Sequence, residues 1–292
     1  MALAAAAPPS PEPQLRALAV ADARVLTVGD RLMRAGASLC PLRAPQFGLA
    51  LHSLGQYAPA HRPAARRLWN LDKGVTVLAL VPGAAAASAG VQVGDRIAAV
   101  DGITVPSTSD AVAVAAMLER RGGPVILDLQ RGGRPLRAQV EPVEGCRSRL
   151  RLVTARRARA SADGTSVTVT TPLLAMARDD HELAFVLAHE IAHNGWGHAA
   201  LRARADGRRF RKELELEADA NALRLMAAAG YDPARALPFL HRLYDGPAGG
   251  LFGAAGHLGR RERLAAIRAR LQSKIHSRLL PQRNSSPAES IG

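Results

Sequence analysis

Residues 189–193 of this chain form the motif His-Glu-x-x-His. It lies within a segment, 179–194, whose apolar content and capping residues predict a helix. One helical turn places His189 and His193 on the same face, where both imidazoles can bind a single zinc ion. Glu190 is rotated by about 100° from them, so it can accept the proton of a water molecule in the open position of the zinc. The motif therefore predicts a metal centre built on a helix.

A second helix is expected to supply the third ligand, because a catalytic zinc ion takes three protein ligands and a water molecule. Within residues 213–219, Glu215 and Asp219 are four positions apart and share one face of the predicted helix. We expect Glu215 to bind the zinc and Asp219 to hold the far nitrogen of a zinc-binding histidine. Glu213 and Glu217 lie on other faces, where solvation is the usual fate of a glutamate.

The sequence pattern changes over residues 70–143, where short β-branched runs alternate with Asp-Gly and Gly-Gly turns and with a capped helix. The most specific part is Pro82-Gly83-(x6)-Gly90-Val91-(x2)-Gly94-Asp95-Arg96-Ile97, followed by Val100-Asp101-Gly102. This order of elements resembles a PDZ domain of the bacterial kind.

The PDZ resemblance implies that the domain captures peptides by strand addition. The loop Asp72-Lys73-Gly74-Val75 is expected to present backbone N–H groups to a C-terminal carboxylate. The peptide would then pair beside the strand 75–80, which includes Val77. The alternative is that the domain binds no peptide and serves only as a spacer or a docking surface.

Residues 145–275 resemble the CAAX-prenyl-protease and HtpX-like zinc metallopeptidases, which are gluzincins. Besides the metal motif, the resemblance rests on Leu183-Ala184-(x2)-Leu187-Ala188, Glu215-(x2)-Ala218-Asp219, Gly230-Tyr231-Asp232-Pro233 and His257-(x4)-Glu262-Arg263. The chain departs from the family pattern at Leu258, where a proline is usual, at Thr171-Pro172, where a glycine is common, and at Arg159-Ala160. These departures leave the zinc ligands untouched and concern the substrate edge near Thr171.

The resemblance to these peptidases implies that Glu215 is the third zinc ligand and Glu190 the general base. It leaves two roles open for His257: a fourth ligand, or a partner of Arg263 in stabilising the oxyanion. A loop histidine in solvent is the alternative for His257. His198, five residues beyond the motif, is turned off the ligand face, so we expect it to be structural.

The net charge alone favours a protein that binds nucleic acid, because 39 basic and 25 acidic residues give a net charge of +14. Only three of the basic residues are lysines, so 39 − 3 = 36 are arginines, which together with the high alanine content indicates a GC-rich genome. Aromatic residues make up 3%, so few side chains could stack on bases. We therefore do not expect nucleic-acid binding, although the Arg-rich segments 202–212 and 260–278 keep it as an alternative. The most apolar stretch, 75–93, is interrupted by proline and glycine, so no membrane-spanning helix is predicted.

The predicted fold class is α+β: a small zincin (gluzincin) peptidase domain with an inserted, β-rich PDZ domain. The expected segments are an Ala/Pro-rich leader (1–13), an N-terminal helix and irregular segment of the peptidase domain (14–69), the PDZ domain (70–143), the zinc metallopeptidase domain (144–280) and a disordered tail (281–292).

The ends of an inserted domain must come close together, and Cys40 and Cys146 flank the predicted insertion. We therefore predict a disulfide between them, which ties the protein to an oxidising compartment. Two buried free thiols in a cytosolic protein are the alternative. The leader lacks a basic n-region and an apolar h-region, so a signal peptide is incomplete or absent. The expected location is nonetheless exported: periplasmic or associated with a bacterial envelope.

The sequence thus predicts an endopeptidase with one zinc ion per chain that cleaves unfolded or misassembled polypeptides. The PDZ domain would bind peptide segments, including C-terminal ones. A peptide-binding or chaperone-like protein with a latent or vestigial peptidase site is the alternative function.

Overall fold

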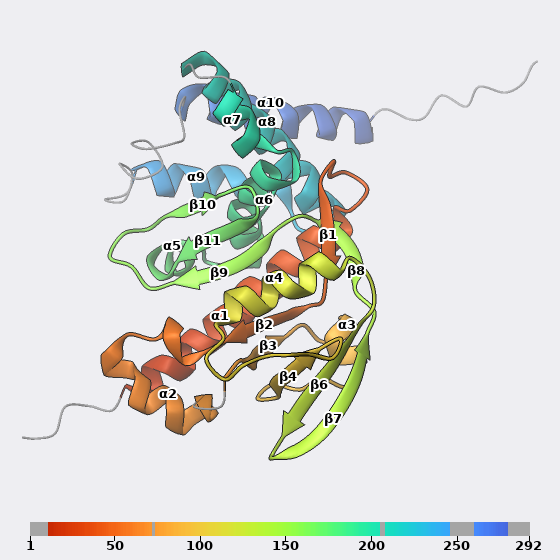
Figure 1. Cartoon of the computed structure of the whole chain (residues 1–292). Helices are drawn as coiled ribbons and strands as arrows, with labels where there is room; N and C mark the ends of the chain where they lie inside the picture. Colours follow the sequence, from red (N-terminus) through yellow and green to blue (C-terminus); the bar gives the residue numbers. More distant parts are fainter. Residues whose placement is uncertain (1–10, 72–73, 205–207, 246–259, 280–292) are drawn as a thin grey trace, which may run out of the picture.

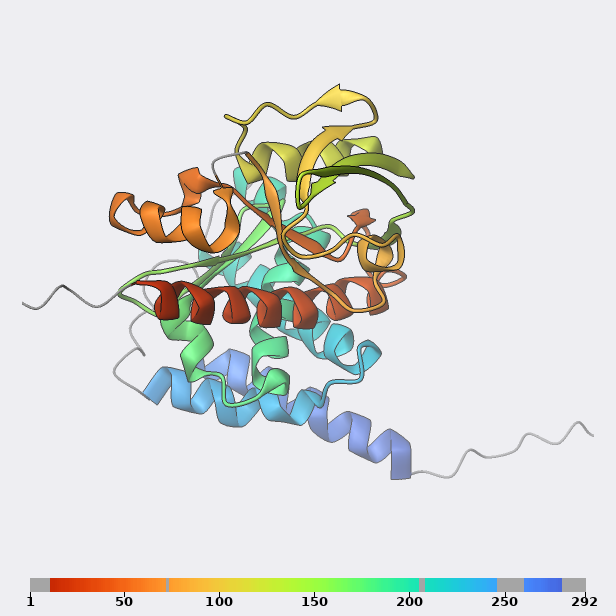
Figure 2. The same cartoon turned by 90° about the horizontal axis from the view of Figure 1, so that it is seen from below.

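The structure, a computed structural model, describes residues 11–71, 74–204, 208–245 and 260–279 (Figure 1). The fold is mixed α+β, as predicted. The long first helix, α1 (Glu12–Ala35), lies between a β-rich part and a mainly helical part (Figures 1 and 2). Among the described residues, no helix has both the length and the hydropathy needed to cross a lipid bilayer.

Helix α1 carries apolar side chains on more than one side, and it packs against both parts of the molecule through them. Val28 and Leu32 are buried in the core of the helical part. Leu26 belongs to a smaller cluster with Ala79 and Val81 of the β-rich part. Each fully buried aliphatic side chain of this size contributes about 1.5–3 kcal/mol to folding. Helix α1 is thus held to each part by an apolar cluster of its own.

The β-rich part is a six-stranded sheet in which five strands follow the order β2-β3-β4-β6-β7, and β5 pairs with β4. All its pairings are antiparallel. Two helices cover it: α3 (Ala85–Ser88) and α4 (Ala111–Arg121). The strands are β2 (Leu49–His52), β3 (Thr76–Leu80), β4 (Arg96–Val100), β5 (Ile103–Thr104), β6 (Val125–Arg131) and β7 (Arg134–Val140).

This sheet begins earlier in the chain than the segment 70–143 that the sequence assigned to the PDZ domain. Strand β2 pairs along β3, and Phe47, Leu49 and Leu51 pack against the core of the sheet. Between β2 and β3 the chain forms η1 (Leu54–Gln56), η2 (Pro59–His61) and α2 (Arg62–Trp69). Because this excursion is rich in proline, β2 looked like part of an irregular segment.

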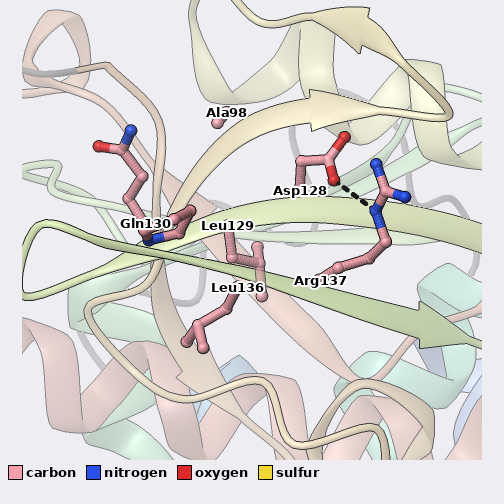
Figure 3. Close-up of a pocket in the computed structure, with 7 residues that line it drawn as sticks. Ala98, Asp128, Leu129, Gln130, Leu136 and Arg137 are labelled. Carbon is pink, nitrogen blue, oxygen red and sulfur yellow. Dashed lines mark hydrogen bonds and ion pairs between the residues drawn. The ribbon is translucent and has the colours of Figure 1, made fainter.

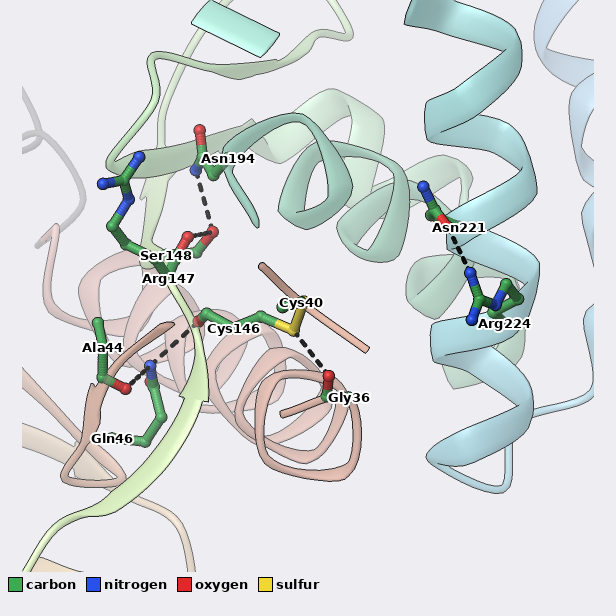
Figure 4. The surroundings of a disulfide bond; sticks show 10 residues. All are labelled: Gly36, Cys40, Ala44, Gln46, Cys146, Arg147, Ser148, Asn194, Asn221 and Arg224. Atoms are coloured by element: carbon green, nitrogen blue, oxygen red, sulfur yellow. Dashed lines mark hydrogen bonds between the residues drawn. A yellow bond between two sulfur atoms is a disulfide. The ribbon is translucent and has the colours of Figure 1, made fainter. Parts of the chain in front are cut away.

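A two-stranded antiparallel ribbon carries the chain into and out of the β-rich part. It consists of β1 (Arg43–Gln46) and β8 (Val143–Cys146), with Arg43 opposite Cys146. The predicted disulfide between Cys40 and Cys146 is present at its base, with the Cα atoms 5.4 Å apart (Figure 4). The two ends of the β-rich part therefore meet at a covalent junction.

The helical part begins with a small sheet in the order β10-β11-β9, in which β11 is parallel to β9 and antiparallel to β10. Helices α6 and α8 pack against each other, and α10 packs against α8 and α9 (Figure 1). The elements are β9 (Arg149–Val153), β10 (Ala160–Ala162), β11 (Ser166–Thr170), α5 (Thr171–Met176), α6 (Asp180–Gly195), α7 (His198–Arg204), α8 (Arg208–Ala228), η4 (Pro233–Arg235), α9 (Ala236–Asp245) and α10 (Arg260–Leu279).

One acidic side chain of α1 makes stability depend on pH. Burial raises the pKa of the Asp22 carboxyl from 3.8 to about 7. Burial and the nearby charge of Asp22 also raise the pKa of Tyr57. Because the unfolded chain ionises near pH 4 and the folded chain near pH 7, the free energy of unfolding should fall by up to about 4 kcal/mol across that window.

The Asp22→Asn variant is therefore expected to be more stable than the wild type at alkaline pH, because asparagine resembles the protonated carboxyl. Its gain in the free energy of unfolding at pH 8 should exceed its gain at pH 5 by roughly 2–3 kcal/mol. Urea unfolding of both proteins at the two pH values measures this difference. An equal gain at both pH values would show that Asp22 does not titrate in this range.

Candidate metal centre

Helix α6 is buried on every side along most of its length, which fixes the position of each side chain it carries. Residues 182–195 are all buried. At its start, the Asp179 carboxylate accepts a hydrogen bond from the backbone N–H of Glu182 over 3.0 Å. The Glu182 carboxylate in turn accepts one from the N–H of Arg178 over 2.8 Å. A helix that is buried all round and capped in this way is a rigid core element.

The structure brings His189, His193 and Glu215 together, although Glu215 comes from α8. Nε2 of His189 lies 3.1 Å from Nε2 of His193 and 3.3 Å from Oε2 of Glu215. Nε2 of His193 lies 3.5 Å from Oε1 of Glu215. A tetrahedral zinc ion with bonds of about 2.0–2.1 Å separates its ligand atoms by about 3.3–3.4 Å. The separations are close to this value, and one ligand atom from each residue lies within 4.8 Å of the others, so the three side chains are placed to share one zinc ion.

Asp219 lies where the sequence predicted, behind His189. Its Oδ1 is 2.9 Å from Nδ1 of His189, so the other ring nitrogen, Nε2, faces Glu215. Burial opposes ionisation of Asp219, but Arg263 and His189 outweigh it and hold the pKa of this carboxyl well below its usual range. An ionised acceptor at Nδ1 fixes both the tautomer and the orientation of a metal-binding histidine.

The two histidines have opposite proton affinities in the metal-free site. Burial and the charge of Arg263 oppose protonation of His189, but hydrogen bonds with Asp219 and Glu215 outweigh them and raise its pKa to about 9. Burial lowers the pKa of His193 to about 3. His193 is therefore neutral at neutral pH, whereas His189 must release a proton before its Nε2 can bind a metal.

Arg263 reaches the site from α10 and is fully buried. Its Nε and Nη2 each donate a hydrogen bond to Asp219 over 2.7 Å, and Nη1 lies 3.4 Å from Oε2 of Glu215. These contacts place the guanidinium behind the carboxylates rather than toward a substrate, so the geometry favours an orienting role over the expected oxyanion role. His257, the other residue expected to act there, lies outside the described residues.

Two residues of α7 join the site that the sequence did not assign to it. Nδ1 of His198 lies 2.9 Å from Nδ1 of His193, and Nη2 of Arg202 donates to Oε1 of Glu215 over 2.8 Å. Burial, followed by the charge of Arg202, lowers the pKa of His198 to about 4, so its ring is neutral. The only sequence signal was a third histidine five residues after the second. A spacing of five residues turns His198 away from the ligand face of the helix. The spacing gave no indication that His198 would contact the other ring nitrogen of His193.

Glu190 follows His189 on α6 and is likewise buried. Because it follows His189 by one position in an α-helix, its Cα–Cβ bond is turned by about 100° from that of His189. A carboxylate in this position has the chemistry of a general base. The site therefore contains each of the residue types that metal-dependent hydrolysis needs.

Two of the peptide-binding residues expected in the β-rich part, Val75 and Val77, lie in its core instead. Val75 and Val77 are 0% exposed, and Asp72 and Lys73 lie outside the described residues. Gly74 has a φ of +107°, which favours glycine. Strand β3 is paired with β2 on one side and β4 on the other, so the prediction that a peptide pairs beside residues 75–80 is wrong. The edge of the sheet on that side is β2.

A surface hollow of about 410 Å³ lies on the β-rich part, on strands β4, β6 and β7 (Figure 3). Its lining residues are Ala98, Asp128, Leu129, Gln130, Pro135, Leu136 and Arg137. The two charged members neutralise each other, since Arg137 donates to Asp128 over 2.8 Å. The hollow lies on the sheet of the β-rich part, whereas the candidate metal ligands lie on helices α6 and α8, and none of them lines the hollow.

Comparison with known proteins agrees with both parts of the fold. The profile of peptidase family M48 matches residues 155–208, which include the His-Glu-x-x-His motif, and a PDZ domain profile matches residues 76–131. The comparison with curated proteins finds no match. One similar solved structure is the HtrA3 PDZ domain bound to a phage-derived ligand (FGRWV), at 19% identity and a TM-score of 0.27, covering 35% of this chain and 88% of that chain. The chain therefore combines an M48 metalloendopeptidase domain, with candidate ligands His189, His193 and Glu215, and a PDZ domain.

Proposed function

We propose that this protein is a zinc-dependent endopeptidase that cleaves unfolded or misassembled polypeptides. The observation that carries the proposal is the placement of one candidate ligand atom from each of His189, His193 and Glu215 within 4.8 Å of one another, with the two histidines on a helix that also carries the buried Glu190. His189, His193 and Glu215 would hold the metal. When bound, zinc supplies a Lewis acid that polarises a peptide carbonyl and acidifies water.

Glu190 would carry the proton transfers of the reaction. Its carboxylate takes a proton from the attacking water and returns it to the nitrogen of the leaving amine. Asp219 keeps the Nδ1 proton on His189, and Arg263 keeps Asp219 ionised. These roles need fixed side chains, which the burial of α6 and the ion pairs of α8 and α10 provide.

The burial of the centre supports extended rather than folded substrates. His189, His193 and Glu215 are 2%, 4% and 0% exposed. A folded protein cannot bring a peptide bond of its surface to such a site, whereas an extended segment can enter it without first losing structure of its own. Unfolded and misassembled polypeptides present such segments.

This function predicts metal-dependent cleavage of an unfolded protein. Casein should be cleaved by the purified full-length chain, cleavage should stop after treatment with a chelator, and added zinc should restore it. Folded serum albumin serves as the matched substrate and should resist cleavage. Zinc binding without any cleavage of casein would instead favour a peptide-binding protein with a latent site.

The PDZ domain would bind peptides at the outer edge of β2 rather than at β3. Strand β2 ends the sheet, α4 lies against it, and Val114 and Leu118 of α4 share its apolar core. An edge strand beside an apolar helix offers both backbone hydrogen bonds and side-chain pockets to an added strand. Gly48 enters β2 with a φ of +68°, and a Cβ there would lie 2.2 Å from the Cβ of Ala84, so only glycine allows this approach.

Hydrogen exchange locates the peptide-binding edge. A peptide with a free C-terminal carboxylate should slow exchange of the amides of residues 49–52, with no change along β7 at the opposite edge. The same peptide with an amidated C-terminus should protect them less, because a carboxylate makes stronger hydrogen bonds than an amide. Protection confined to another part of the sheet would exclude β2 as the binding edge.

The disulfide supports export to an oxidising compartment, such as a periplasm-like space. Mass spectrometry of the protein from its native compartment, without reduction, should find no free thiol. Two alkylated cysteines in that protein would place it in a reducing compartment.

A further inference from the structure

We infer that His198 is a positioning residue that fixes His193 for metal binding, with the Glu217 carboxylate facing its outer nitrogen. The inference rests on the proposed zinc site and extends it to residues that the sequence assigned no role there. Asp219 holds the ring of His189 by a carboxylate. The geometry points to the imidazole of His198 in the same role for His193.

The contact is direct and buried. Nδ1 of His198 lies 2.9 Å from Nδ1 of His193, and both side chains are buried. The chain reverses after α6 at Gly197, whose φ of +72° is easily adopted only by glycine. Asn194 anchors this reversal, because its Oδ1 accepts from the N–H of Gly164 over 2.7 Å and its Nδ2 donates to Ser148 over 3.0 Å. His198 is therefore held against the back of His193.

The contact determines which tautomer each ring adopts. Nε2 of His193 faces His189 and Glu215, so it must be free of a proton to bind a metal, and the proton sits on Nδ1. Only one of the two facing nitrogens can donate, so Nδ1 of His198 must accept. The proton of the neutral His198 ring is then on its Nε2.

Arg202 also approaches Nδ1 of His193, and its effect on that ring is opposite to the effect of His198. Its Nη2 lies 3.5 Å from Nδ1 of His193. An arginine can only donate, so by itself it would stabilise the His193 tautomer that carries the proton on Nε2 and cannot bind a metal. His198 outweighs it, because its nitrogen is closer and accepts.

Glu217 completes the arrangement from the surface of α8. Its Oε2 lies 3.4 Å from the buried Nε2 of His198, while its side chain is 48% exposed. A carboxylate at this position favours the tautomer with the proton on Nε2, which leaves Nδ1 as the acceptor for His193. Glu217, which the sequence suggested was only solvated, therefore acts through His198 on the metal centre.

Two amide substitutions at His198 test this assignment, because each imitates a different ring nitrogen. His198→Asn places an oxygen near the position of Nδ1 and keeps an acceptor for His193. His198→Gln places its amide near Nε2 and leaves no acceptor at Nδ1. Both replacement side chains are polar and similar in size. Comparing the thermal stability of the two variants without zinc shows whether either substitution disturbs folding.

We expect His198→Gln to bind zinc about 10–100-fold more weakly than the wild type, the usual effect of losing such a partner, and His198→Asn to remain close to the wild type. Zinc affinity is measured by competition with a chromophoric chelator, and the absorption spectrum of cobalt-loaded protein reports the geometry of the site. Glu217→Gln should weaken zinc binding, whereas Glu213→Gln, also an exposed glutamate of α8, should not.

Equal zinc affinities and cobalt spectra for wild type, His198→Gln and His198→Asn would overturn the inference and leave the proposed function standing. Equal affinities of Glu217→Gln and Glu213→Gln would overturn the role of Glu217. A wild-type chain that binds no zinc would overturn the proposed function itself, and the inference with it.

Discussion

The Glu190→Gln variant is expected to bind one zinc ion per chain and to cleave casein about 10²–10⁴-fold more slowly than the wild type, the usual contribution of a positioned general base. Glutamine has nearly the same shape as glutamate, so a buried position on a rigid helix should accept it. It has no basic oxygen, so it cannot take the proton of the attacking water. The expected loss is in kcat rather than in KM, because binding of the peptide does not require the proton transfer.

Measurement of zinc content, thermal stability and steady-state kinetics on the same preparation separates this effect from loss of folding. Glu213→Gln is the matched control, because Glu213 is an exposed glutamate outside the ligand cluster. Unchanged cleavage by Glu190→Gln would mean that another group is the base, or that a contaminating protease cleaves the casein.

Removal of both cysteines should destabilise the protein by about 4–5 kcal/mol, the chain-entropy value for a loop of this length. The bond joins positions 106 residues apart, and the loop it closes contains the whole PDZ domain. It also lies against the end of the metal-binding helix. Leu42 donates a backbone hydrogen bond to Gly195 over 2.9 Å, and a Cβ on Gly195 would lie 3.1 Å from Sγ of Cys40.

The Cys40→Ala/Cys146→Ala variant and the wild type are compared by urea unfolding with and without reductant. The wild type should lose stability when reduced and approach the variant, whereas the variant should not respond to reductant. Equal stabilities under oxidising conditions would show that the bond does not constrain the unfolded chain, contrary to this account.

Local spacing was enough to predict much of the metal centre. Helical periodicity alone places His189 and His193 on one face of α6, and the same rule places Glu215 and Asp219 on one face of α8. The structure brings these four side chains to one point. Each pair lies within one helix, where the sequence separation of two residues fixes the directions of their side chains relative to each other.

Contacts between elements were not predictable in this way. Strand β2 joins the PDZ sheet across an excursion of more than twenty residues that contains α2, and nothing within the short run 49–52 specifies its partner. The contact of His198 with His193 depends on a reversal at Gly197 that is anchored by Gly164 and Ser148. Such arrangements follow from tertiary packing, which local propensity does not encode.

The zinc content of three purified proteins shows whether His189, His193 and Glu215 form a zinc site. By elemental analysis after dialysis, the wild type and Glu213→Ala should each contain one zinc ion per chain, and Glu215→Ala should contain almost none. Glu213 and Glu215 are two residues apart on α8, so the comparison distinguishes the ligand face from its neighbour. Full zinc content in Glu215→Ala, or none in the wild type, would contradict a zinc site formed by His189, His193 and Glu215.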